Sequence, residues 1–215
     1  MNISTSGIKK AYDLPDGFVY IDDIIEDCII DAKLAGTDNI TGHPLDGYEK
    51  PLVVMSVEAA EACSKAADIL RKKGYIMKIF DSYRPQSAVD DLCRWGEDLE
   101  DQRRKPIQYP HIDKAKMFEE EYICRKSSHT RGGAIDLTIV NMETHQEVDM
   151  GTCFDYMDTR SWPESTEISE EQHNNRWILR EAMLSCGFIP FPNEWWHFSV
   201  DPEPYPDTYF NFPVR

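Results

Sequence analysis

The spacing of apolar and polar residues predicts three helices. The first begins after Ser56, where apolar side chains start to recur at helical spacing, and ends before Gly74, which supplies a stop. The second begins at Pro85, a residue that suits the first turn of a helix. The third opens with the sequence SEEQ at residues 169–172, a capping box, and ends before Gly187.

Short apolar runs predict three strands: YIMKIF at 75–80, GAIDLTIV at 133–140 and WHFSV at 196–200. In the second run Ile135, Leu137 and Ile139 share one face, which we expect to point into the core, and Asp136 lies on the other face. Helices and strands are interspersed without a regular βαβ rhythm. This order favours an α+β fold, with a central, mainly antiparallel sheet flanked by helices.

Length and composition indicate one folded domain. The 215 residues suffice for one well-packed core and are few for two, and an apolar fraction of 41% argues against a disordered chain. We therefore expect residues 1–215 to form a single domain. The highly charged segment 97–121, which contains Pro106 and Pro110, is predicted to be a surface excursion from it.

The chain is acidic, with 23 Lys and Arg against 39 Asp and Glu. Nucleic acids and anionic membranes both attract basic patches, so this balance argues against either as a partner. The sequence contains no stretch like a signal peptide or a membrane span. Its six cysteines are scattered singly without a CxxC pair, which predicts reduced thiols, a cytoplasmic location and no cysteine zinc site.

Candidate chemistry is concentrated in SSHTRGGAIDLT, residues 127–138. In a continuous strand His129 and Asp136 would face opposite sides, but the two glycines between them permit a turn that brings the histidine back. His197 is the one histidine in an apolar stretch and is the candidate for a third ligand. Two imidazoles and a carboxylate suit a divalent ion such as zinc, with one position left open as in catalytic sites.

A second acid accompanies these residues in NEWWHFSV, residues 193–200. In a regular strand Glu194 would point away from His197, so we expect it in the turn that precedes the strand. From there its carboxylate could take a proton from water in the open position of the metal. Trp195 and Trp196 would hold the turn and keep its surroundings dry. Each residue alone is more often structural, but together they indicate one metal site.

These motifs make the chain similar to the D-alanyl-D-alanine dipeptidases of the VanX type, within the zinc D,D-peptidase superfamily. Five segments carry the resemblance, in the expected order: DNITGHPLDGY (38–48), DSYRP (81–85), SSHTRGGAIDLT (127–138), DMGTCFD (149–155) and EWWHF (194–198). The third and fifth segments mark the superfamily. All five together point to the dipeptidase branch.

The resemblance implies one zinc ion per chain, bound on a face of the sheet by His129, Asp136 and His197. It also implies that Glu194 is the general base and that Arg84 stabilises the oxyanion of the tetrahedral intermediate. A guanidinium fixed beside the metal favours the transition state, because the amide carbonyl gains negative charge on attack. Asp155 would receive the free ammonium group of the substrate, a charge-assisted contact, and Ser127 would help to hold the substrate.

One position departs from the family. In the dipeptidases a tyrosine that also contacts the amino end of the substrate typically precedes the DN.TG element, and here Leu34 occupies this place. Leucine offers no hydroxyl group. Recognition of the amino end is therefore expected to differ in this chain.

The sequence thus predicts a zinc metallopeptidase that hydrolyses D-alanyl-D-alanine or a similar short D-amino-acid dipeptide. One alternative is a D,D-carboxypeptidase that acts on peptidoglycan stem peptides, which would need no acid at the ammonium site, so Asp155 counts against it. Another is a zinc-bearing binding module without catalysis, against which the presence of both Glu194 and Arg84 argues. A structural zinc domain is disfavoured by the mixed ligands and the open position.

Overall fold

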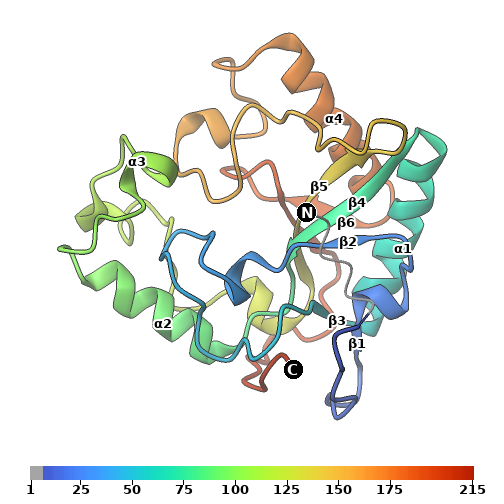
Figure 1. The fold of residues 1–215 in the computed structure, drawn as a ribbon, viewed down its shortest axis with the longest axis horizontal. Helices are drawn as coiled ribbons and strands as arrows, with labels where there is room; N and C mark the ends of the chain where they lie inside the picture. Colours follow the sequence, from blue (N-terminus) through green and yellow to red (C-terminus); the bar gives the residue numbers. More distant parts are fainter. Residues whose placement is uncertain (1–6) are drawn as a thin grey trace.

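A five-stranded sheet runs through the centre of the molecule (Figure 1). The computed structural model of the chain describes residues 7–215, so residues 1–6 of the predicted domain lie outside the described part. Along the sheet the strands are β2 (Ile29–Ile30), β4 (Tyr75–Asp81), β5 (Ala134–Asn141), β7 (His197–Val200) and β6 (Phe188–Pro190). β2 is parallel to β4, and the other neighbours are antiparallel. A separate antiparallel pair joins β1 (Phe18–Tyr20) to β3 (Val54–Ser56).

The longer helices lie on both sides of this sheet. The α-helices are α1 (Val57–Lys72), α2 (Gln86–Glu97), α3 (Lys105–Gln108) and α4 (Glu170–Leu184). Short 3-10 turns complete the structure: η1 (Ile21–Asp23), η2 (Lys33–Ala35), η3 (Lys114–Lys116), η4 (Ser128–Arg131) and η5 (Thr159–Ser161). α1 packs against α4 and β4, whereas α2 and α3 lie on the opposite side of the molecule (Figure 1). The predicted α+β architecture with a mainly antiparallel sheet is confirmed.

Local signals explain where the helices begin. α1 starts directly after Ser56, although the hydroxyl of that residue makes no capping bond, and α2 starts directly after Pro85. At the start of α4 the capping box is present. The Ser169 hydroxyl accepts from the backbone N–H of Gln172, and the Gln172 side chain accepts from the backbone N–H of Ser169.

β5 separates the main core from the functional face of the sheet. Ile135, Leu137 and Ile139 point into the core with residues of α1 and α4, as their alternation predicts. Asp136 lies on the other face and is nevertheless only 2% exposed, because the second side of the sheet is also covered. A polar group buried in this position needs partners from the covering segments.

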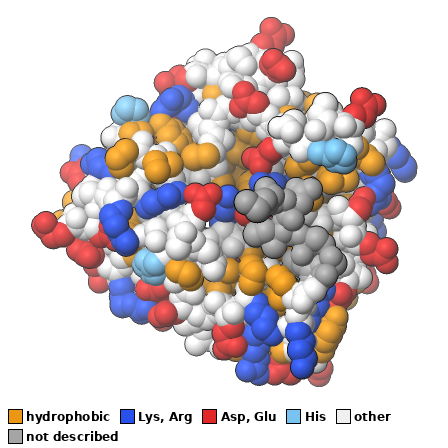
Figure 2. All heavy atoms as spheres, viewed as in Figure 1, with side chains coloured by type: hydrophobic (Ala, Val, Ile, Leu, Met, Phe, Trp, Pro, Cys, Tyr) orange, Lys and Arg blue, Asp and Glu red, His pale blue; other side chains and the backbone are white. Residues whose placement is uncertain are grey.

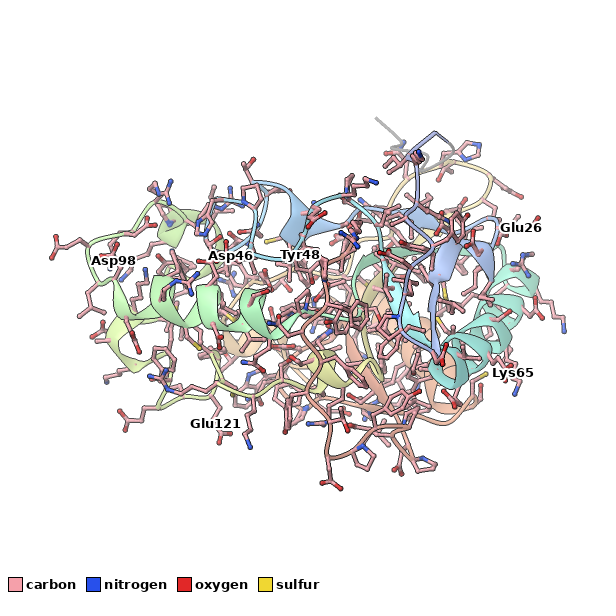
Figure 3. The ribbon with its side chains drawn as sticks, turned by 90° about the horizontal axis from the view of Figure 1, so that it is seen from below. Glu26, Asp46, Tyr48, Lys65, Asp98 and Glu121 are labelled. Carbon is pink, nitrogen blue, oxygen red and sulfur yellow. The ribbon has the colours of Figure 1, made fainter. Side chains whose placement is uncertain are left out.

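A lobe built around α2 and the charged segment 97–121 has a small core of its own. Tyr109 and Met117 from this segment are buried with Trp95 of α2 in a small apolar cluster. Lys114 is also buried, since its ammonium group donates to the backbone carbonyls of Asp98 and Asp101, at 2.8 Å each, and lies over the Trp95 ring. In Figure 3 the lobe is marked by Asp98, at the end of the molecule opposite to Lys65 of α1.

Charged side chains of both signs lie on the surface. On the face drawn in Figure 2, outside the part that grey atoms cover, Lys and Arg side chains are interspersed with Asp and Glu. Of the helices in residues 7–215, none is both long and apolar enough to cross a membrane.

Candidate active site

Three potential metal ligands meet where η4, β5 and β7 come together. Gly132, with a φ of +76°, ends η4 and turns the chain into β5, which brings His129 back over Asp136 as expected. His197 is the first residue of β7, and the register between the strands pairs it directly with Asp136. A side chain at position 132 would collide with Phe18, whose ring lies 2.5 Å from the place of an added Cβ. Glycine is therefore required at this turn.

The ligand atoms of these three residues converge. His129 Nε2 lies 3.0 Å from His197 Nδ1 and 3.3 Å from a carboxylate oxygen of Asp136, and His197 Nδ1 lies 3.0 Å from the other oxygen. All three side chains are buried. Burial opposes ionisation of Asp136, but the adjacent imidazoles outweigh it and hold its pKa below the usual range.

The hydrogen bonds behind the imidazoles select the nitrogens that face the centre. His129 Nδ1 donates to the carbonyl oxygen of Ser82 at 2.7 Å, which leaves the Nε2 lone pair free. His197 Nε2 lies 3.3 Å from the Ser199 hydroxyl and 3.4 Å from that of Ser128, so its Nδ1 remains for a ligand. Two free imidazole nitrogens and an ionised carboxylate fit a divalent transition metal such as zinc.

Glu194 lies in the turn before β7, as expected, with its carboxylate 3.8 Å from His197 Nδ1. Burial, reinforced by the charge of Asp136, raises the pKa of Glu194 to about 7, although His197 and Arg84 oppose this. A carboxylate with such a pKa can exchange protons near neutral pH. The turn is held by Trp195, whose indole N–H donates to the Thr152 hydroxyl at 2.8 Å.

Arg84 projects from the end of β4 into the same site. Its Nε donates to Asp81 at 3.0 Å, and one terminal nitrogen lies 3.6 Å from Asp136. Only Nε is used in the bond to Asp81, so the terminal nitrogens remain for a ligand. The neighbouring carboxylates raise the pKa of Arg84 despite its burial, which keeps the guanidinium charged.

Two further residues, Asp81 and Tyr48, belong to the site and were assigned no role from the sequence. The buried Asp81 carboxylate accepts from the Tyr48 hydroxyl at 2.5 Å as well as from Arg84, and it lies 3.5 Å from His129 Nδ1. Asp81 therefore connects the guanidinium with His129, one of the three potential ligands. Both residues lie in segments that carry the family resemblance. Asp81 also lies at the end of a predicted strand and three positions before Arg84, and this placement could have indicated its role.

A cavity of about 220 Å³ opens over these groups. All seven site residues named from the sequence line it: Arg84, Ser127, His129, Asp136, Asp155, Glu194 and His197. Leu34, the position that departs from the family, lines it too and contributes to an apolar wall with Val89 and Met157. The cavity is thus lined by both polar and apolar side chains.

The two predicted substrate residues differ in their surroundings. Asp155 adopts a φ of +57°, and burial together with the charge of Asp136 raises its pKa well above the usual range. Ser127 caps η4, where its hydroxyl oxygen accepts from the backbone N–H of His129 at 3.2 Å. Ser127 therefore helps to position His129, and its own hydroxyl hydrogen is still free to donate.

A buried His-Asp-His group beside a carboxylate of raised pKa defines a metal-dependent hydrolase site. The family model described as D-ala-D-ala dipeptidase, Peptidase M15, matches residues 15–215, and the chain belongs to this family. The resemblance inferred from the sequence and the predicted class, a zinc metallopeptidase, are confirmed.

Two relatives named D-alanyl-D-alanine dipeptidase agree with this assignment. The chain is 42% identical over 199 residues to a D-alanyl-D-alanine dipeptidase of Enterococcus faecium, covering 93% of this chain and 98% of the relative. It is 38% identical over 197 residues to the enzyme of the same name from Streptomyces coelicolor, covering 92% and 98%. A zinc complex of a VanY D,D-pentapeptidase variant aligns with 73% of this chain and 77% of its own, at 17% identity and a TM-score of 0.43.

Proposed function

We propose that this protein hydrolyses D-alanyl-D-alanine, or a similar short D-amino-acid dipeptide, with zinc held by His129, Asp136 and His197. The observation that carries the proposal is the convergence of these three ligand groups in the cavity that also contains Glu194 and Asp155. The family match and the identity with named D-alanyl-D-alanine dipeptidases support the substrate class.

Glu194 moves the proton in the proposed reaction. When bound, zinc polarises a carbonyl group and makes water a nucleophile at neutral pH. The Glu194 carboxylate takes a proton from the attacking water and returns it to the nitrogen of the leaving amine. Its raised pKa, about 7, suits both directions of this transfer.

Arg84 stabilises the charge that develops on the carbonyl oxygen. Its position is fixed before the substrate arrives, because Asp81 holds Nε and is itself held by Tyr48. A donor fixed in this way acts on the transition state without first reorganising. Removal of such a donor typically costs about 3 kcal/mol of barrier.

Asp155 receives the ammonium group of the dipeptide. Its half-buried carboxyl group lies near the charges of Asp136 and Glu194, which disfavours its charged form until a cation arrives. A substrate ammonium supplies that cation and restores ionisation. The apolar Leu34 in the same cavity adds no hydrogen bond, so Asp155 carries the recognition of the amino end.

The proposed location is the cytoplasm. The six cysteines, all within the described residues, are free thiols, which suits a reducing compartment. Free D-alanyl-D-alanine, as a precursor of the cell wall, is a cytoplasmic compound.

A panel of substrates tests the function. Zinc-loaded protein is incubated with D-Ala-D-Ala, L-Ala-L-Ala and N-acetyl-D-Ala-D-Ala, with and without a chelator, and released amino groups are measured. The proposal predicts cleavage of the free D,D-dipeptide alone, and loss of that cleavage with the chelator. Cleavage of the acetylated peptide alone would indicate a carboxypeptidase, and the absence of all cleavage with zinc bound would indicate a binding module.

A further inference from the structure

Lys126 is a cationic side chain at the cavity that forms no ion pair within residues 7–215 and lies over an aromatic ring. It lines the cavity next to Ser127, and its ammonium group lies 5.1 Å from the centre of the Tyr209 ring. The preceding residue, Arg125, is instead ion-paired with Glu97 at 2.7 Å and does not line the cavity. An unpaired lysine is notable in a chain with 39 acidic and 23 basic residues.

The other cation of the cavity is already engaged. Arg84 donates to Asp81 at 3.0 Å and lies 3.6 Å from Asp136. In the proposed mechanism its terminal nitrogens stabilise the carbonyl oxygen of the amide bond that is cleaved. Lys126 is therefore the cavity cation that remains for a second anionic group on a ligand.

The proposed substrate brings such a group. A free dipeptide is a zwitterion whose ammonium and carboxylate groups lie on either side of its single amide bond. Asp155 is placed to meet the ammonium group, and an anion that enters a cavity already lined by carboxylates requires a compensating cation. A charge-assisted bond from an ammonium to a carboxylate provides this compensation.

We propose that Lys126 binds the C-terminal carboxylate of the substrate and thereby selects dipeptides whose carboxyl end is free. This inference rests on the proposed function, and it adds a second recognition point to that of Asp155. Tyr209 contributes by holding the ammonium group of Lys126 over its ring. Glu121 is another acidic residue that lines the cavity, and it lies at the outer edge of the molecule in Figure 3. Its carboxylate would compete with the substrate for Lys126.

Kinetics with a matched pair of substrates test the inference. The zinc-loaded wild type, Lys126→Met and Lys126→Arg are compared on D-Ala-D-Ala and on its C-terminal amide, which lacks the carboxylate charge. Because Lys126 is exposed, we expect its loss to raise KM for the free dipeptide about fivefold, the upper end for exposed ion pairs, with kcat nearly unchanged. Lys126→Arg restores most of the affinity, and KM for the amide does not respond to Lys126→Met.

Arg125→Met is the matched control, since it removes the neighbouring exposed cation and leaves KM for both substrates unchanged. Equal increases in KM for the free dipeptide and the amide in Lys126→Met would overturn the inference, because they would indicate a structural effect. An unchanged KM for the free dipeptide would overturn it as well. A lower KM in Glu121→Gln, absent when combined with Lys126→Met, would further support it.

Equilibrium binding separates this inference from the proposed function. Zinc-loaded Glu194→Ala, with and without Lys126→Met, is titrated with D-Ala-D-Ala by calorimetry, and Lys126→Met is expected to weaken binding about fivefold. If wild type hydrolyses the dipeptide but Lys126→Met has no effect on binding, only the inference fails. If wild type hydrolyses nothing and Glu194→Ala does not bind the dipeptide, the proposed function fails and the inference with it.

Discussion

Replacing Asp81 with asparagine tests how Arg84, the proposed oxyanion donor, is held in place. The change keeps the size of the side chain but removes its charge, and the amide has only one oxygen to accept from both Tyr48 and Arg84. Arg84 then keeps its own charge but loses the carboxylate that fixes Nε. The proposed zinc ligand His129 is affected less, because its Nδ1 lies 2.7 Å from the Ser82 carbonyl and 3.5 Å from Asp81.

The size of the effect follows from these bonds. A hydrogen bond to a charged group contributes about 1.5–3 kcal/mol, and complete loss of an oxyanion donor costs about 3 kcal/mol. Since Arg84 remains present in Asp81→Asn, we expect kcat to fall about tenfold to a hundredfold, which corresponds to about 1.4–2.7 kcal/mol of barrier. Zinc content, measured by atomic absorption on the same samples, is expected to stay at the wild-type level.

A double-mutant cycle distinguishes positioning from general damage. If Asp81 acts through Arg84, adding Asp81→Asn to Arg84→Ala lowers kcat little further, because the positioned group is already gone. Tyr48→Phe serves as a milder variant that leaves the Asp81 carboxylate in place. The reasoning would be refuted by a kcat of Asp81→Asn within twofold of wild type, or by fully additive losses in the double mutant.

Other predictions concern the base, the ammonium site, the metal and the turn. Glu194→Gln lowers kcat by about 10²–10⁴, the usual contribution of a general base, while zinc content measured in parallel stays unchanged. Asp155→Asn raises KM for D-Ala-D-Ala about tenfold, the loss of one charge-assisted contact, and reduces the preference over N-acetyl-D-Ala-D-Ala in a competition assay. Removal of zinc with a chelator lowers the melting temperature in calorimetry, by about 8–16 °C from a starting zinc concentration of about 1,000 Kd. Gly132→Ala unfolds at a lower urea concentration than wild type, with a loss of more than about 1 kcal/mol, because a side chain at this φ is strained and collides with Phe18.

Local sequence patterns were sufficient to predict the elements that carry the three proposed metal ligands. The alternation in β5 placed Asp136 on the face opposite to Ile135 and Leu137, and the glycines after His129 indicated the turn that reverses the chain. The position of Glu194 before β7 was also predicted from the sequence. Residues three apart in a regular strand point to opposite faces, so Glu194 could approach His197 only from the turn before the strand. In each case the relevant residues are close together in the sequence.

Contacts between distant segments were not accessible in this way. Tyr48 and Asp81 are 33 positions apart, and their bond depends on how the loop before β3 packs over the end of β4. The burial of Lys114 in the charged segment 97–121 could not be predicted either. Its partners are backbone carbonyl groups, which leave no signature in the sequence. The lobe therefore has an apolar cluster of its own that its charge content does not indicate.

The most direct test of the central claim is a zinc titration of metal-free protein with D-Ala-D-Ala hydrolysis as the readout. The account predicts that activity rises in proportion to added zinc and stops rising at one equivalent per chain. It also predicts that His197→Ala, which lacks one of the three convergent ligands, shows no such rise at the same zinc concentrations. Hydrolysis without zinc, or a wild-type titration curve for His197→Ala, would contradict it.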